Sequence, residues 1–141
     1  MTDLGSDSAA TAYATALAAA QPRRLLDLLS TAASFQSPYS LWQDPESVVA
    51  AFQARCRAFR NLQVERVLQD GGNAVVLWNA EVDGRAVQGC EALTLSAGRV
   101  SRVDVFLRPA AVLETVRAAM QAAWPKSEPS RDSSGRRDRE Q

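Results

Sequence analysis

Residues 73–95 read NAVVLWNAEVDGRAVQGCEALTL, and apolar side chains alternate along the first half of this stretch. A period of two predicts a β-strand with one face turned to a core. The apolar face consists of Ala74, Val76, Trp78, Ala80 and Val82. The Asp83-Gly84 pair that follows is a strong signal for a two-residue hairpin turn, so residues 85–95 are predicted to return as the next strand.

The hairpin turn also fixes which side chains face one another. With a two-residue turn, Trp78 faces Gly89 and Val76 faces Glu91. Gly89 then leaves space next to Trp78, as a cavity would need. Glu91 lies on the apolar face, where ionising a carboxyl group is costly, and this makes it a candidate acid or hydrogen-bond donor. A β-bulge would instead turn Glu91 to solvent, and the sequence leaves both arrangements open.

A second turn, at Ala97-Gly98, precedes the last strand. A two-residue turn there places Asp104 opposite Glu91, whereas a three-residue loop with Gly98 in a left-handed bulge places Val103 opposite it. We predict the second arrangement, because it directs an apolar set inward. That set is Val103, Val105 and Leu107, which leaves Asp104, Phe106 and Arg108 on the outer face as a subunit contact surface.

The segments around these strands follow a helical or mixed pattern. Asp44-Pro45 is typical of a helix start, with an N-cap residue and a proline in the first turn. Two further helices are predicted before it: a first helix that ends at about residue 20 and is capped by Ser8 or Asp7, and a short second helix from Pro22 through Leu29. The other predicted elements are an extended piece at 35–39, a strand at 62–68 and a closing helix after Pro109. The order predicts an α+β fold in which N-terminal helices cover one face of a curved antiparallel sheet.

Composition limits the classes of function. Among 141 residues, 46% are hydrophobic, and 16 basic side chains balance 16 acidic ones. Without a basic excess, nucleic acid is not an expected partner. No stretch approaches the roughly 20 apolar residues that cross a bilayer, so no membrane association is expected. Asp3 and Asp7 lie where a signal peptide would carry basic residues, which predicts a cytoplasmic protein.

The C-terminal segment differs from the rest of the chain. Residues 125–141 contain no aliphatic or aromatic side chain, and their charges have mixed signs. Such a segment has nothing to bury, so we predict a folded domain at 1–124 and a disordered polar tail at 125–141.

The chain contains no histidine. This excludes a Ser-His-Asp triad, a Cys-His dyad and every histidine-based metal site, and we expect no metal and no cofactor. Cys56 and Cys90 match no metal-binding spacing, and the simplest interpretation is two thiols in the core.

Several short motifs occur in a recognisable order. They are YATAL at 13–17, FQSP at 35–38, the helix start at Asp44-Pro45, VQGCEALTL at 87–95 and FLRP at 106–109. Together they resemble the nuclear transport factor 2-like superfamily (cystatin-like fold), in its SnoaL-like polyketide cyclase and ketosteroid isomerase branch. The resemblance covers about residues 8–122. It implies a cone, with three helices wrapped by a strongly bent sheet around an apolar pocket, and a homodimer.

The resemblance also implies roles for individual residues. Tyr13 falls where ketosteroid isomerases keep the tyrosine that hydrogen-bonds the substrate oxyanion, and Glu91 falls where they keep the protonated acid that assists it. Ser37 falls where the catalytic base, an aspartate, is expected. Serine is a poor base without an activator, so the isomerase reaction lacks its usual base here.

Three functions remain open from sequence. One is an isomerase- or cyclase-type enzyme that uses Tyr13 and Glu91 as catalytic residues on a small apolar molecule. Another is a non-catalytic module that binds such a molecule, and the last is a dimeric structural module whose cone is filled by its own side chains. The predicted substrate-binding residues are Phe35, Ser37, Tyr39, Trp42, Phe52, Trp78 and Val103.

Overall fold

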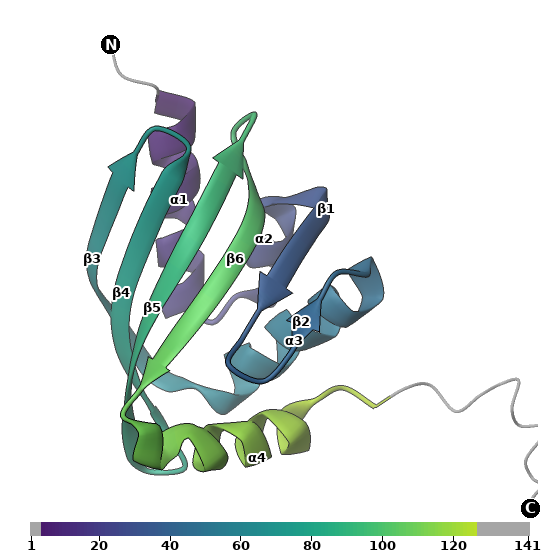
Figure 1. Ribbon diagram of the computed structural model, residues 1–141, viewed down its shortest axis with the longest axis vertical. Helices are drawn as coiled ribbons and strands as arrows, with labels where there is room; N and C mark the ends of the chain where they lie inside the picture. Colours follow the sequence, from purple (N-terminus) through teal and green to yellow (C-terminus); the bar gives the residue numbers. More distant parts are fainter. Residues whose placement is uncertain (1–3, 127–141) are drawn as a thin grey trace, which may run out of the picture.

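The computed structural model describes residues 4–126 and contains helices and one mixed sheet (Figure 1). The helices are α1 (Leu4–Ala18), α2 (Pro22–Asp27), α3 (Pro45–Ala58) and α4 (Leu113–Ala123), which the short 3-10 turn η1 (Ala110–Val112) precedes. The strands are β1 (Leu29–Gln36), β2 (Leu41–Trp42), β3 (Arg60–Asp70), β4 (Asn73–Val82), β5 (Arg85–Ser96) and β6 (Arg99–Arg108). The predicted disordered tail lies outside the described residues from position 127 onward.

The six strands form one curved, unclosed sheet in the order β2-β1-β6-β5-β4-β3. Strands β3 to β6 form an antiparallel meander, and β1 adds to β6 in the parallel direction. Helices α1, α2 and α3 lie on one side of the sheet, and α4 crosses one end of it (Figure 1). We call the helix-covered side the inner face and the space beneath the helices the cone. The predicted α+β class and curved sheet are confirmed.

The predicted register of the first hairpin is confirmed. Trp78 pairs with Gly89, and Val76 pairs with Glu91. Asp83 and Gly84 have φ values of 49° and 79°, as a type I′ turn requires. The five apolar positions of β4 that alternate in the sequence are all buried on the inner face. The alternative in which a bulge turns Glu91 to solvent is therefore excluded.

The second hairpin differs from its prediction. Ala97 and Gly98 have φ values of 54° and 77°, so the turn has two residues rather than three. A bulge follows in β6, where the pairing shifts between Thr94 and Leu95. As a result Glu91 faces Val105 instead of Val103 or Asp104. The predicted directions of the β6 side chains are nevertheless correct. The turn and the bulge together direct Val103 and Val105 inward and Phe106 outward, as expected.

The helical region contains one clear error. The short second helix was predicted to include Leu29, yet α2 ends at Asp27 and Leu29 begins β1. Residues 29–36, LSTAASFQ, hold few β-branched or aromatic side chains, so their propensity for a strand is weak. Pairing with β6 decides the structure of this segment instead. The predicted start of α3 is confirmed, since the Asp44 carboxylate accepts a hydrogen bond from the Ser47 amide at 2.9 Å.

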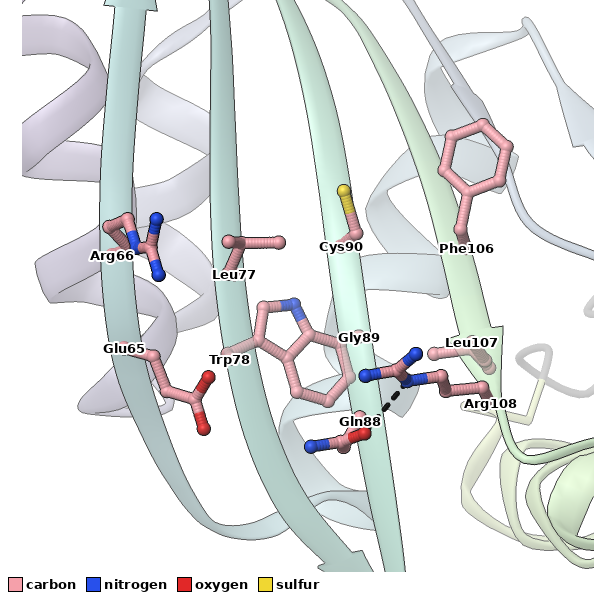
Figure 2. A pocket seen from close by; sticks show the side chains of 10 residues that line it. All are labelled: Glu65, Arg66, Leu77, Trp78, Gln88, Gly89, Cys90, Phe106, Leu107 and Arg108. Atoms are coloured by element: carbon pink, nitrogen blue, oxygen red, sulfur yellow. Dashed lines mark hydrogen bonds between the residues drawn. The ribbon is translucent and has the colours of Figure 1, made fainter.

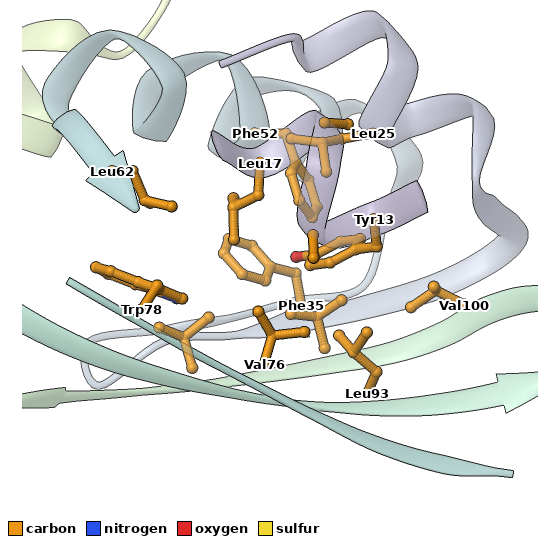
Figure 3. Close-up of a cluster of buried hydrophobic side chains, with 14 of the residues drawn as sticks. Tyr13, Leu17, Leu25, Phe35, Phe52, Leu62, Val76, Trp78, Leu93 and Val100 are labelled. Carbon is orange, nitrogen blue, oxygen red and sulfur yellow. The ribbon is translucent and has the colours of Figure 1, made fainter. Parts of the chain in front are cut away.

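The core lies between the inner face of the sheet and the helices (Figure 3). Val76, Trp78 and Leu93 rise from the strands, while Tyr13 and Phe52 project toward them from helices. All five side chains are at most 2% exposed. Two charged side chains, Arg55 and Glu91, are buried within the same region.

Candidate functional site

Glu91 of β5 is fully buried and accepts hydrogen bonds on both carboxylate oxygens. The Tyr13 hydroxyl donates to Oε1 at 2.5 Å, and the Trp78 indole Nε1 donates to Oε2 at 2.8 Å. The Arg55 guanidinium donates from Nη1 to Oε1 at 3.1 Å and from Nη2 to Oε2, forming a buried ion pair. We call Tyr13, Arg55, Trp78 and Glu91 the Glu91 cluster.

Four separate elements supply the Glu91 cluster, and local sequence patterns orient each side chain. Tyr13 lies on the buried side of α1, and Trp78 and Glu91 are inner-face positions of β4 and β5. Arg55 follows Phe52 by three residues on the inward side of α3, and positions three apart share one face of a helix. The predicted association of Tyr13 with Glu91 is thus present as a direct hydrogen bond.

Sequence reasoning missed Arg55. Its guanidinium carbon lies 5.7 Å from the ring centre of Phe35, 5.8 Å from those of Phe52 and Phe59, and 5.9 Å from that of Trp78. Aromatic faces attract a cation at such distances, which partly offsets the loss of water around the charge. The sequence contains a pattern that could have indicated Arg55: an arginine on the apolar side of one helix and a glutamate on the apolar face of one strand. A buried charge needs an opposite charge beside it, so two such residues are expected to pair.

The ion pair changes the expected chemistry of Glu91. Arginine and the indole N–H can only donate, so the carboxylate acts as an acceptor here rather than as the predicted hydrogen-bond donor. Burial is the largest single influence on the pKa of Arg55 and would lower it. The charge of Glu91, the neighbouring Tyr13 and Cys56, and the hydrogen bonds to Glu91 together outweigh burial and raise that pKa, which keeps the guanidinium charged. The pKa of Tyr13 is raised well above its ordinary value, first by burial and then by the Glu91 charge.

The raised pKa of Tyr13 predicts a loss of stability at high pH. Because the folded-state pKa exceeds the unfolded-state value of about 10, the contribution of Tyr13 is complete below pH 10 and is lost as pH rises through the folded-state pKa. The only other tyrosine is Tyr39, so a Tyr39→Phe variant isolates Tyr13. We expect its tyrosinate absorbance to appear only together with unfolding, as followed by circular dichroism. Tyrosinate formation in a protein that remains folded would contradict the buried hydroxyl.

Within the described part of the chain, the predicted aromatic lining residues pack against one another. Phe35 stacks on Phe52 with ring centres 4.8 Å apart and on Trp42 with ring centres 5.4 Å apart. Trp42 in turn lies 5.5 Å from Trp124, which follows α4. The space expected beside Gly89 is also occupied, since a β-carbon built on this glycine would overlap the Trp78 indole ring. That prediction of a cavity at Gly89 is therefore wrong.

The other predicted binding residues lie apart from the cluster or serve the fold. The Ser37 hydroxyl accepts hydrogen bonds from the amides of Tyr39 and Ser40 at 3.1 and 3.2 Å, which stabilises the turn between β1 and β2. The Tyr39 hydroxyl donates to the carbonyl of Leu113 at 2.6 Å. Val103 is buried on the inner face of β6. Only Tyr13, Glu91 and Trp78, of the predicted site residues, join the cluster.

Two kinds of hollow lie near these residues. A narrow pit of about 40 Å³ reaches Arg55, and its walls include Leu17, Phe59 and Leu62. On the opposite face of the sheet, a shallow hollow of about 490 Å³ is bordered by Leu77, Cys90 and Phe106, among others (Figure 2). Cys90 is half-buried there, so its predicted core position is wrong.

A comparison with models of known protein families identifies the family of this chain. The family model for SnoaL-like domains matches residues 10–103, and the chain therefore belongs to the SnoaL-like domain family. No sequence among curated proteins matches the chain.

Within residues 4–126, no helix is long and apolar enough to cross a membrane, and no group of three or more His, Cys, Asp or Glu side chains is arranged to hold a metal ion.

Solved structures share the fold at low sequence identity. A conserved bacterial protein with a cystatin-like fold from Silicibacter pomeroyi is 20% identical over 84% of this chain and 86% of its own, with a TM-score of 0.77. A steroid delta-isomerase from Pseudomonas aeruginosa is 21% identical over 85% and 91%, also with a TM-score of 0.77. A hypothetical protein with a ketosteroid isomerase-like fold from Catenulispora acidiphila, solved in complex with trimethylamine, is 13% identical over 77% of this chain and 92% of its own, with a TM-score of 0.61.

Proposed function

We propose that this domain binds a small molecule with a mainly apolar body inside the cone, with the polar end of that molecule at the Glu91 cluster. The observation that carries the proposal is the buried ion pair between Arg55 and Glu91. Removing two charges from water costs several kcal/mol per ion, and well-packed apolar residues often give equal or greater stability. A role beyond folding would account for a buried pair that apolar residues could replace, and a ligand that uses the pair supplies such a role.

The relatives in structure support a small organic ligand. A steroid is a large apolar molecule with few polar groups, and the structural neighbour from Pseudomonas aeruginosa is a steroid delta-isomerase. The neighbour from Catenulispora acidiphila holds a small amine. The aromatic side chains around Arg55 offer the kind of apolar wall that such molecules contact.

Binding is better supported than an isomerase- or cyclase-type reaction at Tyr13 and Glu91. Isomerisation of an unsaturated ketone needs a base that removes a proton next to the carbonyl and returns it farther along the carbon chain. Glu91 already accepts hydrogen bonds on both oxygens from Tyr13, Arg55 and Trp78, so neither oxygen is free to face a substrate proton. Ser37, which falls at the position of the usual base, uses its hydroxyl within a turn. We therefore propose binding without turnover.

Calorimetric titration with 2-acetonaphthone, a neutral aromatic ketone, tests this function. We expect saturable binding to one site per chain, with the ketone oxygen in the pit of about 40 Å³ beside Arg55 and the larger apolar body against the apolar walls of that pit. In a parallel assay by ultraviolet absorbance, we expect no acceleration of the conversion of a β,γ-unsaturated steroid ketone to its conjugated isomer. Absence of saturable binding by this ketone and by 2-naphthoate, the acid of the same shape, would refute the proposed ligand class. Turnover that a Tyr13→Phe variant abolishes would establish an enzyme instead.

The outer face of the sheet supports a second proposal, a homodimer. Phe106 is 59% exposed and stands between two hollows of about 490 and 580 Å³. The face has an apolar centre formed by Leu68, Val75, Leu77, Cys90, Ala92 and Phe106. Charges of both signs surround it, including Glu65, Arg66, Arg102, Asp104 and Arg108. Such a face is complementary to a second copy of itself when the two copies are related by a twofold axis.

A Phe106→Arg variant tests the dimer. The new charge would meet its own copy near the twofold axis, so we expect the mass from light scattering to fall from that of a dimer to that of a monomer of 15.2 kDa. Leu41→Arg is a matched control, because Leu41 is 49% exposed but lies on β2, away from the apolar centre. A monomeric wild-type protein, or a Phe106→Arg variant that stays dimeric, would contradict the proposed interface.

A further inference from the structure

The pit beside Arg55 connects the Glu91 cluster with the edge of the domain. It lies where the end of α1, the end of α3 and the start of β3 meet, and its volume is about 40 Å³. This volume accommodates about one ordered water molecule or the head group of a small ligand. The residues that line it are Leu17, Ala18, Ala20, Arg55, Cys56, Phe59, Asn61 and Leu62. The walls are therefore mostly apolar, and Arg55 is the charged group among them.

Arg55 retains hydrogen-bond donors for which the side chains described from residue 9 to residue 126 supply no partner. A guanidinium has five N–H groups in a planar fork. Within the described part of the chain, the Arg55 side chain bonds only to Glu91, through Nη1 and Nη2. Its side chain is only 3% exposed, so bulk water does not solvate the remaining donors. Leaving buried charged donors unpaired is costly, and this points to an acceptor that occupies the pit.

The chemistry of the site selects the kind of acceptor. A cation is disfavoured, because it would approach the Arg55 charge while both Glu91 oxygens are already occupied. Arginine can bind one carboxylate at the end of its fork and another acceptor along its Nε side. Glu91 bonds to both Nη atoms at the end of the fork, which leaves the Nε side available. Bonds between two charged groups are roughly twice as strong as neutral ones, so a carboxylate is favoured over a ketone.

We propose that the pit is the binding site for the carboxylate group of a small aromatic or aliphatic acid. The acid oxygens accept hydrogen bonds from the Nε side of Arg55, and the apolar body lies against Leu17, Phe59 and Leu62. This inference rests on the proposed function and adds to it the class of ligand and the route by which the ligand enters.

The experiment compares acids with ketones of the same shape. Acetate, benzoate and 2-naphthoate are titrated into the full chain beside acetone, acetophenone and 2-acetonaphthone, at neutral pH, by calorimetry and by ¹H–¹⁵N NMR. We expect the best acid to bind about tenfold or more tightly than its matched ketone, because its bonds to Arg55 are charge-assisted.

Two variants in which phenylalanine replaces an alanine locate the site. Ala18 and Ala19 are both exposed at the end of α1, but Ala18 lines the pit and Ala19 does not. We expect Ala18→Phe to weaken the best acid by about tenfold or more because the ring obstructs the pit, and Ala19→Phe to leave its affinity unchanged. Both variants should keep the wild-type thermal midpoint, since neither position is buried.

The outcomes separate this inference from the proposed function. Equal affinity for acids and ketones would overturn the carboxylate assignment and leave small-molecule binding intact. Acid binding that Ala18→Phe does not change would overturn the pit as the site. Failure of all six compounds to bind saturably would overturn both proposals together.

Discussion

An Arg55→Leu variant is expected to lose about 3–5 kcal/mol of unfolding free energy, the largest effect of any single substitution considered. Leucine packs well among the aromatic rings that surround position 55, but it removes the only positive charge that contacts Glu91 within residues 4–126. A fully buried carboxylate would then remain without its countercharge. Urea denaturation followed by circular dichroism measures the loss.

Two further variants make the measurement specific to the ion pair. Arg102→Leu breaks the exposed pair of Arg102 with Asp104, whose arginine side chain is 52% exposed, and we expect little or no loss of stability because water screens this pair. A double variant, Arg55→Leu with Glu91→Gln, removes both charges while the amide oxygen can still accept from Trp78. We expect it to be more stable than the sum of the two single losses predicts. Strictly additive losses would contradict a coupled buried pair.

A Gly89→Ala variant is expected to lose roughly 3 kcal/mol through a different mechanism. The added methyl group would overlap three ring carbons of the Trp78 indole, so the ring has to move. Its movement also weakens the hydrogen bond from the indole Nε1 to Glu91 at 2.8 Å. Urea denaturation gives the loss, and tryptophan fluorescence reports the displaced ring.

Gly71→Ala is the control for this substitution. Gly71 has a φ of 61°, and a β-carbon there meets no atom within 4 Å. Alanine at this position bears only the strain of the left-handed backbone, about 1–2 kcal/mol. A Gly89→Ala variant that loses no more stability than Gly71→Ala would show that the indole does not fill the space above Gly89.

Much of the site could be predicted from the first hairpin. The type I′ turn at Asp83-Gly84 fixes the register, and the two-residue period of β4 then decides which face Glu91 occupies. The register and the face of Glu91 are local properties, because each depends on neighbouring residues of one hairpin. The association of Glu91 with Tyr13, 78 positions earlier in the chain, came from the family resemblance and agrees with the observed hydrogen bond.

The features that were missed depend on contacts between distant segments. Arg55 looks like a solvated helix residue until α3 is placed over β5, where the Glu91 charge stabilises it. Strand β1 has weak propensity and forms because β6 lies beside it. The two-residue turn at Ala97 and Gly98 would by itself place Asp104 opposite Glu91. The bulge in β6 shifts the pairing by one residue, so that Val103 points inward, and the sequence of the turn alone does not indicate this bulge. Each error therefore reflects tertiary structure that overrides a local pattern.

The position of a bound ligand tests the central claim that the functional centre is the Glu91 cluster. In a crystal of the wild-type protein soaked with 2-naphthoate, we expect electron density inside the cone, with the carboxylate against Arg55. Density only in the outer hollow beside Phe106 would contradict this claim and place the functional centre on the opposite face of the sheet.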